Sequence, residues 1–278
     1  MLEIIFLATL ALIFILFAVV ADFKYRIVPN WLNFSLIVFA FAFRFFYSLF
    51  NSDFNFFFQG LIGFGIFFAL GNALYYGRMF AGGDAKLMMA LGVVIPFSDS
   101  LISNLQIFLL FLILFLFSGA AYGIIISAIL LAGNFKECKK EISKQFHKNK
   151  KLILLAEIIG ILIMVFSFGG IFFYLGIIAF ILPFLYILAK AVDEKCLVKK
   201  MKTKDLGEGE WLYENVKIGK RTIKSSWEGL SKEELNLIKK KFKEIKIRQG
   251  IPFTPAFLIS FVLLVFFYFN GINIFDFF

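Results

Sequence analysis

Two aspartates are the residues whose type and position in this chain could support chemistry. Asp22 follows the first long apolar run, and Asp84 follows Gly82 and Gly83 between two further apolar runs. Two carboxylates that share a proton can activate a water for attack on a peptide carbonyl and can protonate the leaving amine. Taken singly, each aspartate has an ordinary explanation, at a helix end or in a glycine turn. Together they are a candidate acid and base pair.

The other residue types give no comparable support to a different catalytic chemistry. The single histidine, His147, lies in a lysine-rich segment, and Cys138 and Cys196 lie far apart in a chain without a C-x-x-C pattern. A serine or cysteine nucleophile, a zinc site and a disulfide framework therefore find no support in the sequence. We expect no metal ion and no cofactor.

The composition indicates a membrane protein. Of 278 residues, 61% are hydrophobic and 17% are charged. Several apolar runs approach or exceed the roughly 20 residues that a membrane-spanning helix needs. The net charge of +10 is interpreted through membrane topology, because Lys and Arg collect in cytoplasmic loops. No nucleic acid is expected as a partner, and an acid at membrane depth is a functional hypothesis by default.

The apolar runs predict an all-α polytopic membrane protein with about eight transmembrane helices. The first run is interpreted as a retained helix and not as a cleaved signal peptide, because its positive charges follow it. Pro29 suits the first turn of the second helix. The run over residues 152–189 has basic segments on both sides, so it is expected to form a hairpin that turns at Phe168-Gly169-Gly170. The predicted crossings are residues 2–21, 31–50, 56–76, 85–97, 101–131, 152–189 as two helices, and 252–270.

The fourth predicted helix, residues 85–97, is short for a membrane span. At 1.5 Å per residue it covers about 20 Å, against a hydrocarbon core of about 30 Å. If its outer end reaches the far interface, its start lies below the cytoplasmic surface. Asp84 is then expected at membrane depth, in a cavity that admits water.

The charge distribution predicts the orientation of the chain. With eight crossings, the Lys and Arg residues fall on the cytoplasmic side, apart from Arg44 in the outer half of a helix. Both Asp22 and Asp84 are then at the cytoplasmic face of the cell membrane. Arg44 is expected to snorkel outward, with pairing inside the bundle as the alternative. The dipoles of the first and fourth helices favour a protonated Asp22 and an ionised Asp84.

Residues 190–250 are the only sizeable soluble segment of the sequence. A strand is predicted at 211–216, followed by a turn near Gly219-Lys220 and a second short strand. Ser231 and Glu234 form a capping-box pattern. These two residues begin a predicted helix, and one face of this helix is expected to contain Leu235, Ile238, Phe242 and Ile245.

The chain is therefore expected to have three parts. Residues 1–189 are the membrane core with the two aspartates and about seven helices. Residues 190–250 are a small cytoplasmic module of the α+β class, with its strands before its helix. Residues 251–278 contain the final transmembrane helix.

Two segments resemble the catalytic segments of type IV prepilin peptidases. Asp22-Phe23-Lys24-Tyr25-Arg26-Ile27-Val28-Pro29-Asn30 resembles the first, an Asp followed by Ile/Val-Pro-Asn, and Gly82-Gly83-Asp84-Ala85-Lys86 resembles the second, Gly-x-Gly-Asp-x-Lys. The soluble module and residues 247–255 are similar to archaeal members, so the resemblance covers most of the chain. Ala81 departs from the pattern, because it stands where the first Gly of the motif would be. The cysteine pairs of bacterial relatives are also missing.

The resemblance implies a membrane-embedded aspartic endopeptidase of the GxGD type. It would remove the short basic leader from type IV pilin-like or preflagellin precursors at the cytoplasmic face, without methylating the new N-terminus. The implied catalytic residues are Asp22 and Asp84. The residues expected to support the active-site loop are Gly82, Gly83, Lys86, Pro29 and Asn30. Lys86 is two residues beyond Asp84, so the two do not share a helix face and are not expected to form an ion pair.

Two functions of other classes stay open at this point. A carboxylate-based transporter would also place acids in broken membrane helices, and a non-catalytic scaffold for pilus assembly would explain the soluble module. No clear internal repeat favours the transporter, and both acids are expected near one face and not at the midplane. For the peptidase, the expected partners are pilin-like or flagellin precursors and the lipid bilayer.

Overall fold

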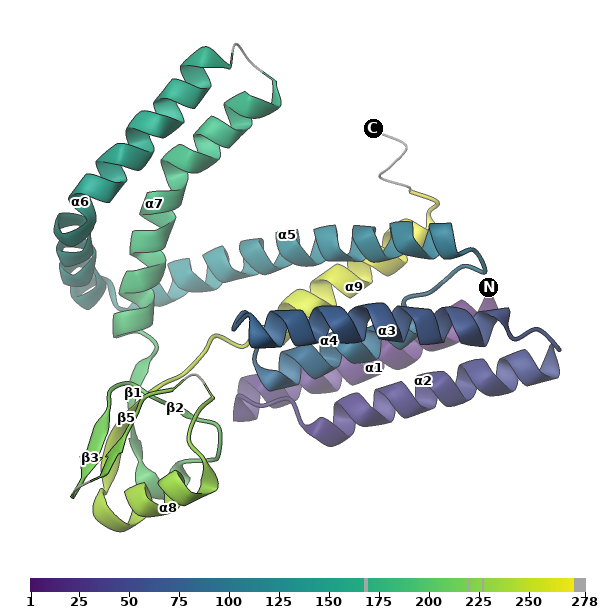
Figure 1. Ribbon diagram of the computed structural model, residues 1–278, viewed down its shortest axis with the longest axis horizontal. Helices are drawn as coiled ribbons and strands as arrows, with labels where there is room; N and C mark the ends of the chain where they lie inside the picture. The colour runs from purple at the N-terminus through teal and green to yellow at the C-terminus, as the bar shows by residue number, and fades with distance from the viewer. Residues whose placement is uncertain (168–169, 220, 227, 273–278) are drawn as a thin grey trace. The chain divides into compact units, whose positions relative to one another are not determined.

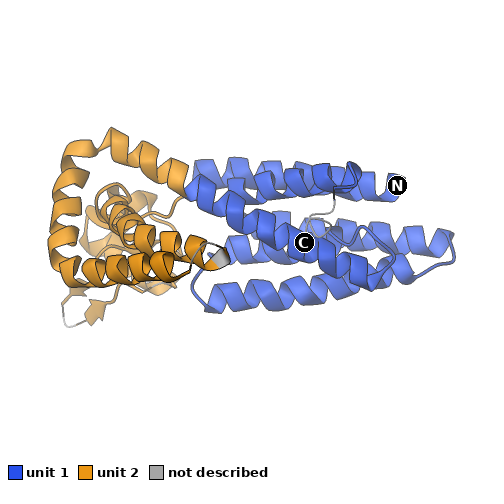
Figure 2. Ribbon diagram, turned by 90° about the horizontal axis from the view of Figure 1, so that it is seen from above, with its two compact units in different colours: residues 1–123, 252–278 blue, residues 124–251 orange. Residues whose placement is uncertain are grey.

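The computed structural model describes residues 1–167, 170–219, 221–226 and 228–272. These residues are mostly helical, with a small sheet module before the last helix (Figure 1). The chain divides into two compact units, Met1–Gly123 with Pro252–Phe278, and Ile124–Ile251 (Figure 2). One hydrophobic cluster lies in the first unit and another in the sheet module of the second.

The first unit is a helical bundle whose helices lie side by side in both views (Figures 1 and 2). Its elements are α1 (Leu2–Tyr25), α2 (Asn30–Phe50), α3 (Asn55–Tyr76), α4 (Gly82–Val94), most of α5 (Leu101–Gly133) and α9 (Thr254–Phe269). Helix α4 contacts α1, α2 and α3. Most of its side chains from Ala85 onward are buried. This short helix is therefore the centre of the bundle.

Five described helices are long and apolar enough to cross a membrane, namely α1, α2, α3, α5 and α7 (Ile171–Lys195). Helices α4 and α9 are shorter, with 13 and 16 residues. Helix α6 (Phe135–Phe166) is long, but its first half is rich in lysine. The helical, multi-pass class is therefore supported, and the number of eight crossings stays a prediction.

The bounds of α4 differ from the prediction of a helix over residues 85–97. The helix begins at Gly82 and ends at Val94. The following residues Ile95 and Phe97 are buried but not helical. Apolar character alone placed the end of this helix too late. A buried segment need not be helical if its backbone carbonyl groups accept hydrogen bonds from donors outside the helix.

Glycines allow α3 and α4 to pack closely. A Cβ atom on Gly63 would collide with the carbonyl oxygen of Gly92, and a Cβ atom on Gly92 would collide with Phe67. Small residues at a helix crossing let two backbones approach, which is the usual way that helices pack inside a membrane. These two glycines therefore set the distance between α3 and the central helix.

Arg44 is fully buried, and the prediction that it snorkels outward was wrong. Its guanidinium donates to the carbonyl oxygens of Val93, Val94 and Pro96 at 2.7, 3.1 and 2.6 Å, and to that of Phe56 at 2.8 Å. The last carbonyl groups of a helix have no partner within the helix, and a guanidinium carries five N–H donors in a fixed fork. Arg44 is buried because its guanidinium donates hydrogen bonds to the carbonyl groups at the end of α4, which water does not reach.

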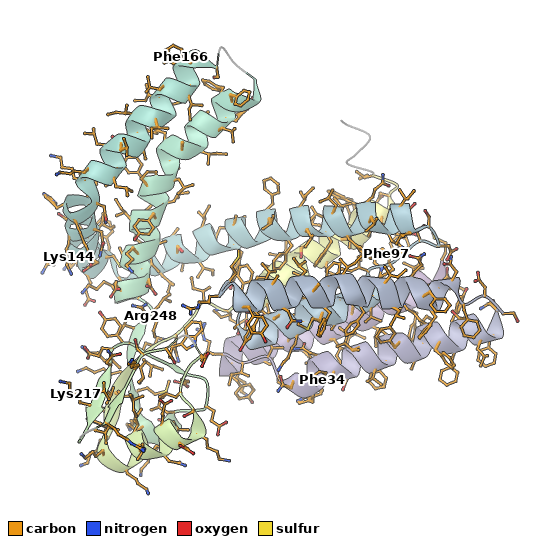
Figure 3. The ribbon with its side chains drawn as sticks, in the orientation of Figure 1. Phe34, Phe97, Lys144, Phe166, Lys217 and Arg248 are labelled. Atoms are coloured by element: carbon orange, nitrogen blue, oxygen red, sulfur yellow. The ribbon has the colours of Figure 1, made fainter. Side chains whose placement is uncertain are left out.

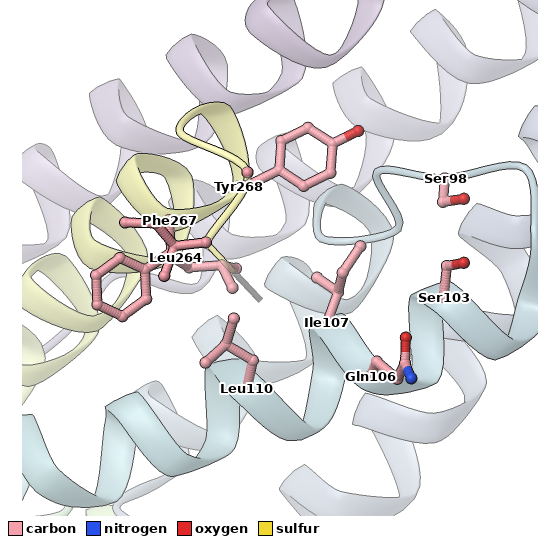
Figure 4. Close-up of a pocket in the computed structure, with 10 residues that line it drawn as sticks. Ser98, Ser103, Gln106, Ile107, Leu110, Leu264, Phe267 and Tyr268 are labelled. Atoms are coloured by element: carbon pink, nitrogen blue, oxygen red, sulfur yellow. The ribbon is translucent and has the colours of Figure 1, made fainter. Parts of the chain in front are cut away.

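A pocket lies at the end of this unit where α5 begins and α9 ends (Figure 4). Polar side chains on its lining are Ser98, Ser103, Gln106 and Tyr268, and the hydroxyl of Tyr268 donates to the carbonyl of Phe97 at 2.8 Å. Its described lining contains no carboxylate, histidine or cysteine. The pocket is near the C-terminal end of α4, whereas Asp84 is at the N-terminal end.

In the second unit, α6 and α7 pack along each other as the hairpin prediction requires. A Cβ atom on Gly160 or on Gly176 would lie 2.9 Å from the backbone of the other helix, which is closer than van der Waals contact allows. Helix α6 ends at Phe166 and α7 begins at Ile171. Phe168 and Gly169 of the predicted turn lie outside the described residues. Helix α6 also begins earlier than predicted, so it includes the lysine-rich segment.

The module contains an antiparallel sheet of order β1-β5-β2, made of β1 (Val198–Lys202), β5 (Glu244–Arg248) and β2 (Trp211–Leu212). A separate hairpin pairs β3 (Val216–Ile218) with β4 (Arg221–Ile223). The predicted single strand over 211–216 is therefore two short strands that pair with different partners. Gly219 occupies the hairpin turn with φ of 60°, and Lys220 lies outside the described residues.

The helix of the module is α8 (Lys232–Lys241), and its predicted capping box is confirmed. Ser231 and Glu234 exchange the reciprocal side-chain to backbone hydrogen bonds. Leu235 and Ile238 are buried as predicted. The helix ends one residue before Phe242, and Ile245 lies in β5. Both residues pack against the same cluster, but from outside the helix.

Candidate active site

Asp22 and Asp84 come from different helices at the same end of the first unit. Asp22 lies in the last turn of α1, and Asp84 lies in the first turn of α4. The two helices are in contact, and the two carboxyl groups are close enough to interact electrostatically. Asp22 is buried and Asp84 is partly buried. The structure therefore brings together two acids that are 62 positions apart in the sequence.

Thr254, which was not among the predicted site residues, holds the carboxylate of Asp22. Its hydroxyl donates to Oδ2 of Asp22 at 2.9 Å, and its backbone N–H donates to the same atom at 3.2 Å. Thr254 is fully buried and is the first residue of α9. Asp22 is therefore in contact with the N-terminus of a helix, an end that favours negative charge.

These contacts oppose the expectation that Asp22 carries the proton. That expectation considered only the dipole of α1, whose C-terminal end disfavours a carboxylate. Two donors converge on one oxygen of Asp22. An ionised carboxylate can accept such hydrogen bonds with either oxygen. Unlike a protonated carboxyl group, it carries no O–H that needs an acceptor of its own. The contacts with α9 thus favour Asp22 as the ionised member of the pair and leave the shared proton to Asp84.

Gly83 lets the start of α4 approach the loop between α1 and α2. A Cβ atom at this position would lie 3.0 Å from Cβ of Val28 and 3.4 Å from its backbone nitrogen. The side-chain amide of Asn33 also donates to the carbonyl of Gly83 at 3.2 Å. The neighbouring Gly82 is less restricted, because a Cβ atom there would only meet Tyr75 at 3.6 Å. Of the two glycines, Gly83 is the one that close packing requires.

Ala81 stands at the position of the first Gly of the motif and is the N-cap residue of α4. Its backbone angles, φ −69° and ψ 159°, are in the ordinary extended region, and the residue is exposed. Any L-residue adopts these angles without strain. The additional methyl group therefore does not disturb the start of α4, which explains how the chain tolerates this departure from the motif.

Lys86 connects the two motif segments. Its ammonium group donates to Oδ1 of Asn30 at 2.7 Å. Pro29 is the N-cap residue of α2 and Asn30 is the first residue of that helix. The contact joins the first turn of α4 to the first turn of α2. This contact favours the predicted role of Lys86 in supporting the loop around the aspartates.

Two buried polar atoms near the aspartates have no hydrogen-bond partner among the described residues. They are Oδ1 of Asn33 and the hydroxyl oxygen of Tyr122. The other end of the Asn33 amide binds Gly83, and Tyr122 is close enough to Asp22 to interact with it electrostatically. Buried polar groups are normally paired, so both atoms are available to bind a reactant. A single Asn or Tyr in an apolar run has no spacing pattern that would reveal it.

The cysteines lie together in the second unit, which the sequence did not predict. The Sγ atoms of Cys138 and Cys196 are 3.3 Å apart, and both cysteines are free. Burial, followed by the hydrogen bond with Cys138, raises the pKa of Cys196 to about 12. A thiol with so high a pKa is a poor nucleophile. Within the part of the chain that the structure describes, no three His, Cys, Asp or Glu side chains could hold a metal ion.

The region that contains both aspartates also matches a known family. Residues 9–128 match the model of the type IV leader peptidase family. Comparison of the chain with curated proteins and with solved structures gives no match. The matched segment includes Asp22, the glycine turn, Asp84 and Arg44, whereas Thr254 lies beyond it.

Thr254→Val is expected to slow peptide cleavage about tenfold, because a hydrogen bond to a charged group contributes roughly 1.5–3 kcal/mol. Valine has nearly the shape of threonine but lacks the hydroxyl that binds Asp22. Thr254→Ser keeps the donor and is expected to retain most of the rate. Initial rates on a precursor peptide, measured for both variants, check this expectation. Equal rates for the valine and serine variants would show that the hydroxyl acts only in packing.

Proposed function

We propose that this protein is an aspartic endopeptidase of the GxGD type. It removes the short basic leader from type IV pilin-like or archaeal flagellin precursors. One observation carries the proposal. Within the segment that matches the family, the ends of α1 and α4 place two carboxyl groups close enough to interact electrostatically. Two interacting carboxyl groups can divide the roles of acid and base between them.

The contacts of each aspartate support a division of roles. Asp22, held by Thr254, is the base that takes a proton from water as the water oxygen bonds to the scissile carbonyl carbon. Asp84 carries the shared proton and gives it to the nitrogen of the leaving amine as the C–N bond breaks. The products are a leader with a new carboxyl group and a mature protein with a free amine. No metal ion or cofactor has a role in these steps.

The proposed topology is that of a multi-pass protein of the cell membrane with the active site at the cytoplasmic face. Eight crossings are obtained when α4, α9 and the apolar second half of α6 are added to the five longer helices. The distribution of Lys and Arg supports the orientation. Arg44 is no longer an exception to it, because its side chain is buried at the end of α4 and faces neither surface.

The test is cleavage of a synthetic precursor by the purified chain in detergent. One peptide carries a basic leader followed by an apolar helix, and a matched peptide has the leader lysines replaced by glutamine. Mass spectrometry is expected to find a released leader and a mature fragment with a free, unmethylated amine from the first peptide. Slower cleavage is expected for the second. If the folded enzyme leaves the basic peptide intact, the proposed function is wrong.

A further inference from the structure

The first half of α6 carries a one-sided basic surface. Lys136, Lys140, Lys144 and Lys148 occur at every fourth position, so they form a row along one side of the helix. Three further lysines flank this row, and all seven are exposed. The basic face of α6 consists of Lys136, Lys139, Lys140, Lys144, Lys148, Lys150 and Lys151.

The opposite side of the same half-helix is fixed against the rest of its unit. Cys138, Glu141 and Gln145 are buried there. Cys138 contacts Cys196 near the end of α7, and Glu141 pairs with Lys195 at 3.8 Å. Glu141 also pairs with Lys144 at 3.5 Å. For the other lysines of the basic face, no ion pair is found among the described residues. The basic face is therefore directed away from its own unit and is largely uncompensated.

The second half of α6 has the opposite character. From Leu152 on, the helix is apolar apart from Glu157, and its large side chains are exposed, among them Leu152, Leu155 and Val165 at 63, 59 and 62%. In a membrane protein, exposed side chains of this kind face lipid. Helix α6 therefore enters the bilayer near Leu152, and the basic face directly precedes this point.

The two halves of α6 do not point in the same direction. Figure 1 shows the first half nearly end-on and the second half rising along α7, and Figure 3 labels Lys144 and Phe166 on the two parts. The bend keeps the basic half from extending straight out of the membrane.

We propose that the basic face of α6 binds the anionic headgroups of membrane lipids. A group of four to eight lysines next to a membrane helix attracts anionic lipid, and the attraction is lost beyond a Debye length. The basic leader of a precursor has the same sign of charge and is repelled by this face. Lipid is therefore favoured over the substrate as its partner. The preference for lipid over the leader rests on the proposed substrate, whereas lipid binding itself is separate from peptide cleavage and does not need peptidase activity.

Hydrogen exchange of residues 135–151 in lipid nanodiscs tests the proposal with the full chain. In nanodiscs that contain phosphatidylglycerol, exchange is expected to be about fivefold slower than in nanodiscs of phosphatidylcholine alone. This is the effect expected from the contact of one lysine with an anionic headgroup. High salt should remove the difference. The variant K136Q/K140Q/K148Q should show a clearly smaller difference between the two lipids, because it retains only four of the seven lysines.

A matched variant, K199Q/K200Q/K217Q, removes the same charge from three exposed lysines of the module. It should keep the difference between the two lipids. Protection that appears in phosphatidylcholine nanodiscs on adding inorganic phosphate would identify free anions as the ligand and overturn the assignment to lipid. Equal exchange of wild-type residues 135–151 in both lipids would overturn the proposal altogether.

Discussion

Replacing either Asp22 or Asp84 by asparagine is expected to lower the rate of leader cleavage at least about 10³-fold, within the range that general acid and base groups contribute. Asparagine has the size of aspartate and can still accept from Thr254, so the variants should fold. It cannot take a proton from water and does not deliver one to the amine. Each half of the pair is needed in the proposed mechanism, so neither variant should retain substantial activity.

The rates are measured by mass spectrometry on the basic precursor peptide, with thermal unfolding of each variant as the check on folding. Asp53→Asn is the matched control, since Asp53 is an exposed aspartate in the loop between α2 and α3. Its variant should cleave at the wild-type rate. A folded Asp22→Asn or Asp84→Asn enzyme that cleaves normally would exclude the two-aspartate mechanism, although the chain could still be a peptidase of another type.

Replacing Arg44 by methionine is expected to lower the free energy of unfolding by at least about 3 kcal/mol. The guanidinium binds four backbone carbonyl oxygens in a fully buried position. Methionine fills much of the volume but leaves these acceptors unpaired, and each unpaired buried group costs about 1–3 kcal/mol. The end of α4 should therefore become unstable, and with it the centre of the bundle.

Arg44→Lys is the informative comparison for this prediction. It keeps the charge, but an ammonium has three donors at one point in place of a planar fork. It should reach fewer of the four carbonyls and give an intermediate loss of stability. Thermal unfolding in detergent measures both variants. A methionine variant that unfolds at the wild-type temperature would show that these hydrogen bonds do not maintain α4.

The membrane helices and the two acids could be predicted from the sequence because their signals are local. Long apolar runs predict α1, α2 and α3 within a few residues of their observed bounds. Asp22 and Asp84 are conspicuous because acids are rare in such surroundings. Their placement at the same face followed from topology, since both were predicted at the cytoplasmic ends of their helices. None of these inferences needed to know which side chains touch.

Features that depend on a specific partner could not be predicted in this way. Thr254 binds Asp22 across 232 positions of the chain, and no spacing pattern joins them. Arg44 was predicted to snorkel outward because hydropathy rules count the unfavourable free energy of burying its charge. They do not count the hydrogen bonds that the guanidinium can donate to backbone carbonyl groups. The strands β1 and β5 are rich in charged residues, and they become strands because they pair with each other. In each case a distant group decides the local outcome.

The contact between Thr254 and Asp22 also has a consequence for how the enzyme is made. Asp22 and Asp84 leave the ribosome early, but the donor that holds Asp22 is made 232 residues after it. A nascent chain that has already inserted α1 to α4 therefore contains both acids without the group that holds one of them. In the proposed mechanism the pair is complete only after α9 has joined the bundle, so synthesis itself would delay the onset of proteolysis until the protein is assembled.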